Sequence, residues 1–152
     1  MYKYETHLHT SPVSRCARAT VEESLDFYKN MAYEEKIEFY FSDYEKALEI
    51  GEKLGIKVFY AQELSYRGTD FLIYGLDKEW YLSHPEIMEM KKSDELALMM
   101  ENEALVIQAH PYREASYIDH IRLFPRCIHG VEIVNACRSE EENQMAKIFA
   151  EH

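Results

Sequence analysis

The chain has 152 residues, of which 47% are hydrophobic and 30% are charged, which fits one globular domain with a substantial core rather than a disordered chain. Its formal net charge of −11 argues against binding to nucleic acid or to an anionic membrane, because both need clustered positive charge. The three cysteines are odd in number and form no C-x-x-C pair, so we expect no disulfide framework and a reducing, cytoplasmic location.

The sequence predicts neither a leader peptide nor a membrane span. Its N-terminus lacks a basic segment followed by an apolar run, and no apolar run approaches the ~18 residues that a spanning helix needs. It also lacks internal repeats and linkers rich in proline or glycine. We therefore expect residues 1–152 to form a single domain.

The first half of the sequence predicts two strands separated by two helices. In order, we expect a strand at 2–8, a helix from about 20 to 31, a helix at 34–54 and a strand at 56–61. Thr20 and Glu23 have the spacing of a capping box at the start of the first helix. Gly55 stands where the second helix should end. A regular βαβ pattern would place a strand between the two helices, and none is predicted there.

The second half continues the alternation of strands and helices. We expect a turn at 67–70, a strand at 71–74, short helices within 76–90, a helix from Ser93 to about 102, strands at 104–109 and 131–134, a short helix at 118–124, and a final helix opened by Ser139. Ser139 and Glu142 form a second capping box. The uninterrupted apolar run at 104–109 is typical of strands buried on both faces. Together the elements predict an α/β fold with a mainly parallel sheet.

Several residues that can bind metals follow or end the predicted strands. His7 and His9 are two residues apart on a strand, so their imidazoles should face the same side. Glu63 and His110 follow two other strands, and in α/β folds such strand ends meet at one edge of the sheet. Imidazole and carboxylate ligands suit Zn²⁺, Mn²⁺ and Fe²⁺. The alternative is a set of polar strand ends that only hydrogen-bond to loops.

Arg113 lies three residues after His110 and could bind a phosphate group, because a guanidinium matches the geometry of phosphate oxygens. The alternative is an ordinary surface arginine. The sequence contains no glycine-rich phosphate loop, no G-x-S-x-G and no H-E-x-x-H motif.

Four segments together resemble, in their order and spacing, the PHP (polymerase and histidinol phosphatase) family. They are Glu-Thr-His-Leu-His-Thr at 5–10, Ala-Gln-Glu-Leu at 61–64, Gln-Ala-His-Pro-Tyr-Arg at 108–113 and Gly-Val-Glu-Ile-Val-Asn at 130–135. The resemblance implies a distorted (β/α)7 barrel that binds up to three divalent metals at its C-terminal mouth and hydrolyses phosphate esters. By the same resemblance His7 and His9 would hold one metal, Glu63 would bridge two, and His110 would hold the second.

The sequence departs from the family pattern in four places. One is the loop after His9, where Ser14-Arg15-Cys16 stand near the position of an acidic residue that the family often has. Glu5 stands where the family usually has an aspartate. The family's second strand, which ends in a Thr-Asp-His-like motif, has no counterpart around 31–33, and the sequence ends before any Asp-x-His-like motif. The resemblance therefore implies an incomplete barrel, shortened internally and at the C-terminus. Missing strands would expose sheet edges, so we expect a homo-oligomer or a poorly stable monomer.

We therefore interpret the sequence as a metal-dependent phosphoesterase, similar to histidinol phosphatases, that acts on a small phosphorylated substrate. A water activated by Mn²⁺, Zn²⁺ or Fe²⁺ would attack the phosphate, with His110 and Arg113 as the catalytic residues. The alternative is a degenerate PHP-like protein that binds a metal or a partner without catalysis, and a purely structural α/β protein is a third reading.

Overall fold

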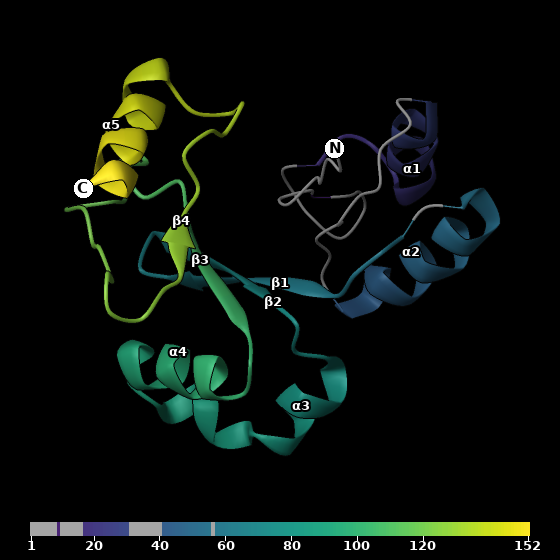
Figure 1. Ribbon diagram of the computed structural model, residues 1–152, viewed down its shortest axis with the longest axis horizontal. Coiled ribbons are helices and arrows are strands. Elements are labelled where there is room, and N and C mark those ends of the chain that lie inside the picture. Colours follow the sequence, from purple (N-terminus) through teal and green to yellow (C-terminus); the bar gives the residue numbers. More distant parts are fainter. Residues whose placement is uncertain (1–8, 10–16, 31–40, 56) are drawn as a thin grey trace. The chain divides into compact units, whose positions relative to one another are not determined.

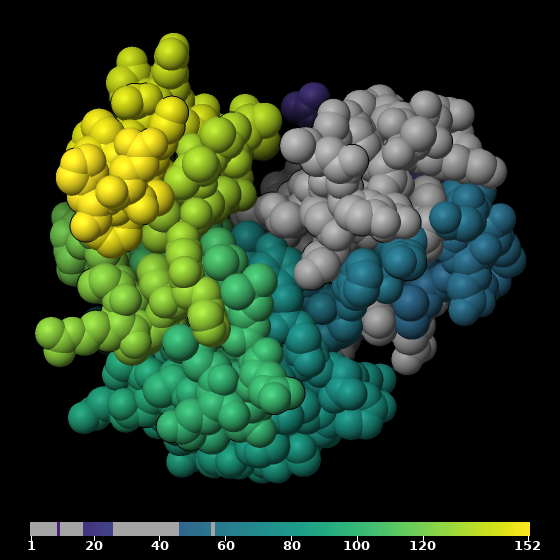
Figure 2. Space-filling view, in the orientation of Figure 1, coloured from purple at the N-terminus to yellow at the C-terminus, as the bar shows by residue number. Residues whose placement is uncertain are grey.

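The structure is a computed structural model that describes residue 9 and residues 17–30, 41–55 and 57–152. The predicted strand at 2–8, residue His7 and the start of the second predicted helix lie outside the described residues. The chain divides into two compact units, Met1–Glu63 and Leu64–His152. Figure 1 shows the chain as a ribbon, and Figure 2 is a space-filling view in the same orientation.

The first unit contains two helices, α1 (Val21–Asn30) and α2 (Phe41–Leu54). The predicted capping box at α1 is confirmed, because the Thr20 backbone N–H donates to Glu23 Oε2 at 2.9 Å and the Glu23 N–H donates to Thr20 Oγ1 at 3.2 Å. Gly55 ends α2 with a φ of +72°, as a C-terminal cap requires. The two helices share a small apolar core made of Val21, Leu25 and Ala47, with Ile50, Leu54 and Val58 packed against it.

The sheet has four strands in the order β1-β2-β3-β4. They are β1 (Ala61–Tyr66), β2 (Thr69–Tyr74), β3 (Leu105–Ala109) and β4 (Gly130–Val131). The predicted mixture of helices and strands is confirmed, as are the strands near 71–74 and 104–109. The predicted strand at 131–134 is present only over its first residue, since pairing with β3 ends at Val131.

The expectation of a mainly parallel sheet is wrong for the described strands. β2 and β3 pair antiparallel, and only the two-residue β4 pairs parallel to β3. β1 and β2 are joined by the two-residue turn Arg67–Gly68, which is too short for a parallel crossover. Arg67 and Gly68 have φ values of +51° and +85°, which is the backbone signature of a tight hairpin.

The predicted strand at 56–61 is also wrong over 57–60, where the chain has no strand pairing. β1 instead begins at Ala61, so Glu63 lies inside a strand and not after one. Phe59 and its neighbours have higher intrinsic β propensity than Gln62 and Glu63, but pairing with β2 decides where the strand forms.

The second unit contains α3 (Lys78–Ser83), a 3₁₀ helix η1 (Pro85–Glu89), α4 (Lys92–Glu101) and α5 (Glu140–Glu151). The short helices predicted within 76–90 are confirmed. The predicted cap at Ser93 is wrong, because α4 begins after Lys91 without a side-chain cap. The capping box of Ser139 and Glu142 is confirmed at the start of α5. In Figure 1, α3 and α4 lie on one side of β2 and β3, and α5 lies beside β4.

The helix predicted at 118–124 is absent, and that segment is irregular. Gln108, which is fully buried in β3, holds it in place. Its Nε2 donates to the Arg122 carbonyl at 2.7 Å, and its Oε1 accepts from the Phe124 N–H at 3.3 Å. These contacts join residues far apart in sequence, which the local pattern could not predict.

The core of the second unit lies between one face of the sheet and the helices. Its buried members are Phe71, Ile73, Leu76, Ile87, Leu96, Met99, Ala104 and Val106, with Leu64 and Tyr66 of β1 packed against them. Side chains alternate along a strand, so Asp70, next to Phe71, and Glu63, next to Leu64, belong to the opposite face. No helix among the described residues is long and apolar enough to cross a membrane.

Candidate metal centre

Asp70 is the central residue of the candidate site. It lies in β2 directly opposite Ala109, so the strand register brings it beside His110, the residue that follows β3. Its Oδ2 lies 2.7 Å from Arg113 Nη1 and 3.6 Å from His110 Nε2. The Asp70 side chain is only 5% exposed, so its negative charge needs these partners to remain in the interior.

The backbone holds the His110 ring toward Asp70. His110 has a φ of +27°, a conformation that residues other than glycine adopt rarely and that often marks functional sites. Its N–H donates to Glu132 Oε2 at 2.9 Å, and the Glu132 carboxylate also accepts from Asn135 Nδ2 at 3.2–3.3 Å. The segment after β4 therefore fixes the position where β3 ends.

Arg113 is held in the same place by a turn of the hairpin. Its Nη2 donates to the Gly68 carbonyl at 2.9 Å, and its guanidinium carbon lies 5.9 Å from the centre of the Tyr117 ring. Its buried Nε has no hydrogen-bond partner among the described residues. The side chain is 17% exposed, so it is not a freely solvated surface arginine.

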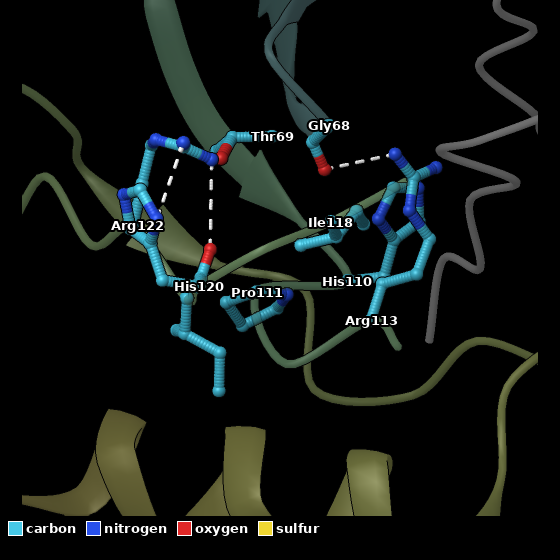
Figure 3. A pocket seen from close by; sticks show the side chains of 9 residues that line it. Gly68, Thr69, His110, Pro111, Arg113, Ile118, His120 and Arg122 are labelled. Atoms are coloured by element: carbon cyan, nitrogen blue, oxygen red, sulfur yellow. Dashed lines mark hydrogen bonds between the residues drawn. The ribbon is translucent and has the colours of Figure 1, made fainter. Parts of the chain in front are cut away.

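A small cavity adjoins Arg113 and His110 (Figure 3). Its volume is about 10 Å³, which is room for roughly one water molecule. It is lined by Gly68, Thr69, His110, Pro111, Arg113, Ile118, His120, Ile121 and Arg122. Four of these side chains carry or can carry positive charge, and each of the four lies beside a carboxylate of Asp70 or Asp119.

Within the first unit, His9 and Glu63 are partners. The distance from His9 Nε2 to Glu63 Oε2 is 3.3 Å, and both side chains are mostly buried. An imidazole and a carboxylate at this distance are two ligands of the kind that a divalent metal uses. His7, which the sequence pairs with His9, lies outside the described residues.

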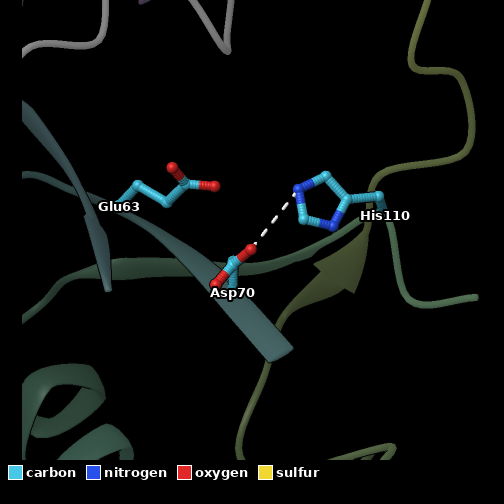
Figure 4. A group of neighbouring side chains, drawn as sticks. All are labelled: Glu63, Asp70 and His110. Carbon is cyan, nitrogen blue, oxygen red and sulfur yellow. Dashed lines mark ion pairs between the residues drawn. The ribbon is translucent and has the colours of Figure 1, made fainter. Parts of the chain in front are cut away.

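Glu63 lies in β1, the strand next to β2 in the sheet. One oxygen each of Glu63 and Asp70 and one ring nitrogen of His110 lie within 4.8 Å of one another (Figure 4). Two carboxylates this close repel unless a cation neutralises them, and with an imidazole they form a suitable ligand set for a divalent metal. The residues therefore fit a metal ion, which makes this a possible metal site.

Asp70 is the residue that sequence reasoning missed, because it was assigned to a turn. The available signal was its place directly before the apolar run Phe-Leu-Ile-Tyr at 71–74, which the structure extends back to Thr69 as a strand buried at every position. Such a residue needs a partner or a metal.

In sequence, the chain matches no family model and no curated protein. In structure, it is similar to a two-domain protein from Bacteroides vulgatus ATCC 8482 that contains a predicted PHP-like metal-dependent phosphoesterase, with a TM-score of 0.67 and 14% identity. The chain has a PHP-like fold. It is also similar to a proposed metal-dependent phosphoesterase from Bifidobacterium adolescentis ATCC 15703, with a TM-score of 0.64 and 10% identity.

The alignments with these two structures cover 97% and 99% of this chain. The chain spans about half of the first neighbour, at 48% of its length, and 82% of the second. At these identities the likeness shows the fold alone. The PHP resemblance is therefore confirmed at the level of the fold, while the shortened (β/α)7 barrel stays a prediction.

Proposed function

We propose that this PHP-like chain is a metal-dependent phosphoesterase that hydrolyses small phosphate esters. The observation that carries the proposal is the convergence of Glu63, Asp70 and His110 within 4.8 Å. His9 would join them through Glu63, and His7 would join through the sequence pattern that pairs it with His9. Two structural neighbours are named as predicted or proposed metal-dependent phosphoesterases, which supports the same reaction class.

Mn²⁺, Zn²⁺ or Fe²⁺ bound by these residues would polarise the phosphate and lower the pKa of a water toward about 7, which supplies the nucleophile. Arg113 would steady the phosphate with charge-assisted hydrogen bonds, and its buried Nε is a donor available for this. The Gly68 carbonyl, which accepts from Arg113 Nη2 at 2.9 Å, would keep the guanidinium beside the site. The hydrogen bond from His110 N–H to Glu132 keeps the imidazole at the edge of the sheet.

One observation favours the alternative of a PHP-like protein that binds a metal or partner without catalysis. The Arg113 guanidinium lies 2.7 Å from Asp70, so this carboxylate has a cationic partner within the chain itself. A site stabilised in this way could persist as an ion pair after catalysis is lost, so the two functions need a direct test.

The test is metal content by elemental analysis together with Mn²⁺-dependent hydrolysis of p-nitrophenyl phosphate. His110→Ala should lose both, with turnover falling by more than about 100-fold, because loss of even an outer partner of a metal ligand costs about 10–100-fold. His152→Ala, at an exposed histidine of the C-terminus, is the matched control and should behave as the wild type. Metal binding without turnover would favour the non-catalytic alternative, and turnover retained in His110→Ala would refute the proposed site.

A further inference from the structure

We propose that Arg113 competes with the metal for Asp70, and that metal binding releases its guanidinium to bind phosphate. Arg113 would then couple the two ligands, and would not be a fixed phosphate clamp. This inference rests on the proposed metal site but concerns the order of events there. It is carried by residues of the second unit alone, Asp70, His110, Arg113 and Gly68.

The first step is that one oxygen serves two groups. Asp70 Oδ2 is the atom that Arg113 Nη1 contacts at 2.7 Å, and the same atom faces His110 Nε2 at 3.6 Å. A cation that binds Asp70 Oδ2 together with His110 Nε2 would therefore approach the oxygen that already holds the guanidinium. Both side chains of the ion pair are largely buried, so water screens the repulsion between two such cations only weakly.

The second step is that Arg113 has another anchor and an unused donor. Nη2 stays bound to the Gly68 carbonyl at 2.9 Å, which holds the side chain near the site after Nη1 leaves Asp70. Nε is buried and has no hydrogen-bond partner among the described residues. Once released, Nη1 regains its N–H donors for a phosphate oxygen, and the Nε–H, on the other side of the guanidinium, is a further donor with no partner among the described residues.

The consequence is a thermodynamic linkage. If metal binding frees Arg113 for phosphate, the metal raises the affinity for phosphate, and phosphate must raise the affinity for the metal by the same factor. Couplings of this kind are typically about 5–150-fold. A fixed clamp that never touched a metal ligand would instead leave the metal affinity independent of Arg113.

The test is calorimetric titration with Mn²⁺ in the absence of phosphate. Arg113→Met removes the competing charge and should bind Mn²⁺ about tenfold more tightly than the wild type, within the typical range of couplings. The matched control is Arg122→Met. Arg122 is 15% exposed, similar to Arg113, but it pairs with Asp119 at 3.0 Å and not with Asp70, so its loss should leave the affinity unchanged. Repeating the titrations with inorganic phosphate should strengthen Mn²⁺ binding more in the wild type than in Arg113→Met.

A second measurement uses the wild type, in case Arg113→Met does not fold. In ¹⁵N-labelled protein the Arg113 guanidinium should show hindered rotation without metal, and its signals should shift when diamagnetic Zn²⁺ saturates the site. Signals that stay unchanged at saturation would overturn the inference, as would an Arg113→Met variant that binds Mn²⁺ equally or less tightly.

The outcomes also separate this inference from the proposed function. Ester hydrolysis by a wild type whose metal affinity does not depend on Arg113 would leave the function standing and overturn the coupling. Binding of Mn²⁺ by Arg113→Met but not by the wild type would support the competition and refute the phosphoesterase. Absence of metal binding in both proteins would overturn both.

Discussion

Replacing Asp70 by alanine removes the carboxylate that Arg113 contacts at 2.7 Å, and leaves a guanidinium that is 17% exposed without its main partner. Breaking a buried ion pair from one side costs about 3–5 kcal/mol of unfolding free energy, whereas exposed pairs contribute about 0–1 kcal/mol. Asp70 is almost fully buried but water reaches part of Arg113, so we expect a loss of about 3 kcal/mol, at the lower end of that range.

The double-mutant cycle isolates the pair itself. Arg113→Met alone leaves the Asp70 carboxylate buried between the His110 imidazole and the Glu63 carboxylate, so it should also destabilise the protein. The double variant Asp70→Ala/Arg113→Met has neither charge left to be unpaired. It should therefore lose less unfolding free energy than the sum of the losses in the two single variants. We expect a coupling of about 2 kcal/mol, inside the range found for residues that share one network.

The assay is urea unfolding at pH 7 with a chelator present, followed by tryptophan fluorescence. The chain has one tryptophan, Trp80, and it lies in α3 of the second unit together with Asp70 and Arg113. The signal therefore reports unfolding of the unit that contains the pair. Asp119→Ala is the control, because Asp119 is 74% exposed and its pair with Arg122 should contribute less than about 1 kcal/mol. A coupling between Asp70 and Arg113 below about 0.5 kcal/mol would refute the reasoning, since distant, independent sites already scatter by that amount.

Three further predictions concern the rest of the chain. Leu96→Ala should destabilise the second unit by about 3 kcal/mol in the same urea assay because Leu96 is fully buried, while Leu82→Ala, at a side chain that is 71% exposed, should change stability by less than about 0.5 kcal/mol. Burial raises the pKa of Glu142, but the backbone N–H groups of Glu114 and Ser139 donate to its carboxylate and bring that pKa below its ordinary value of 4.5. The ionised carboxylate therefore stabilises the fold above pH 4.5 and loses this contribution as the pH falls further. In urea unfolding over a pH series, Glu142→Gln should be less stable than the wild type at pH 7 and approach it in acid. A difference in unfolding free energy that does not change with pH would contradict this. The predicted homo-oligomer should appear in size-exclusion chromatography with light scattering, and a thermally robust monomer would count against it.

The sequence alone was sufficient to predict the elements whose ends are set by contacts between residues close together in the chain. The capping boxes at Thr20 and Ser139 are closed by hydrogen bonds between residues three apart, so their spacing predicts them directly. The apolar runs of β2 and β3 and the position of His110 after β3 also follow from the sequence alone.

Direction and register of the strands could not be predicted in the same way. An apolar run shows that both faces of a strand are buried, but parallel and antiparallel neighbours bury it equally. The Arg67–Gly68 turn carried the missing information, because two residues can join only antiparallel strands. Recognising the hairpin would have placed Asp70 inside β2, where a charge needs a partner, and would have added it to the predicted ligands.

The most direct test of the central claim is the anomalous difference map of a crystal soaked in Mn²⁺. We expect a manganese peak between Asp70 and His110, on the face of the sheet that carries Glu63, with the Arg113 guanidinium no longer paired with the Asp70 carboxylate. Strong peaks elsewhere with none at these residues, or an undisturbed Arg113–Asp70 ion pair at full manganese occupancy, would contradict it.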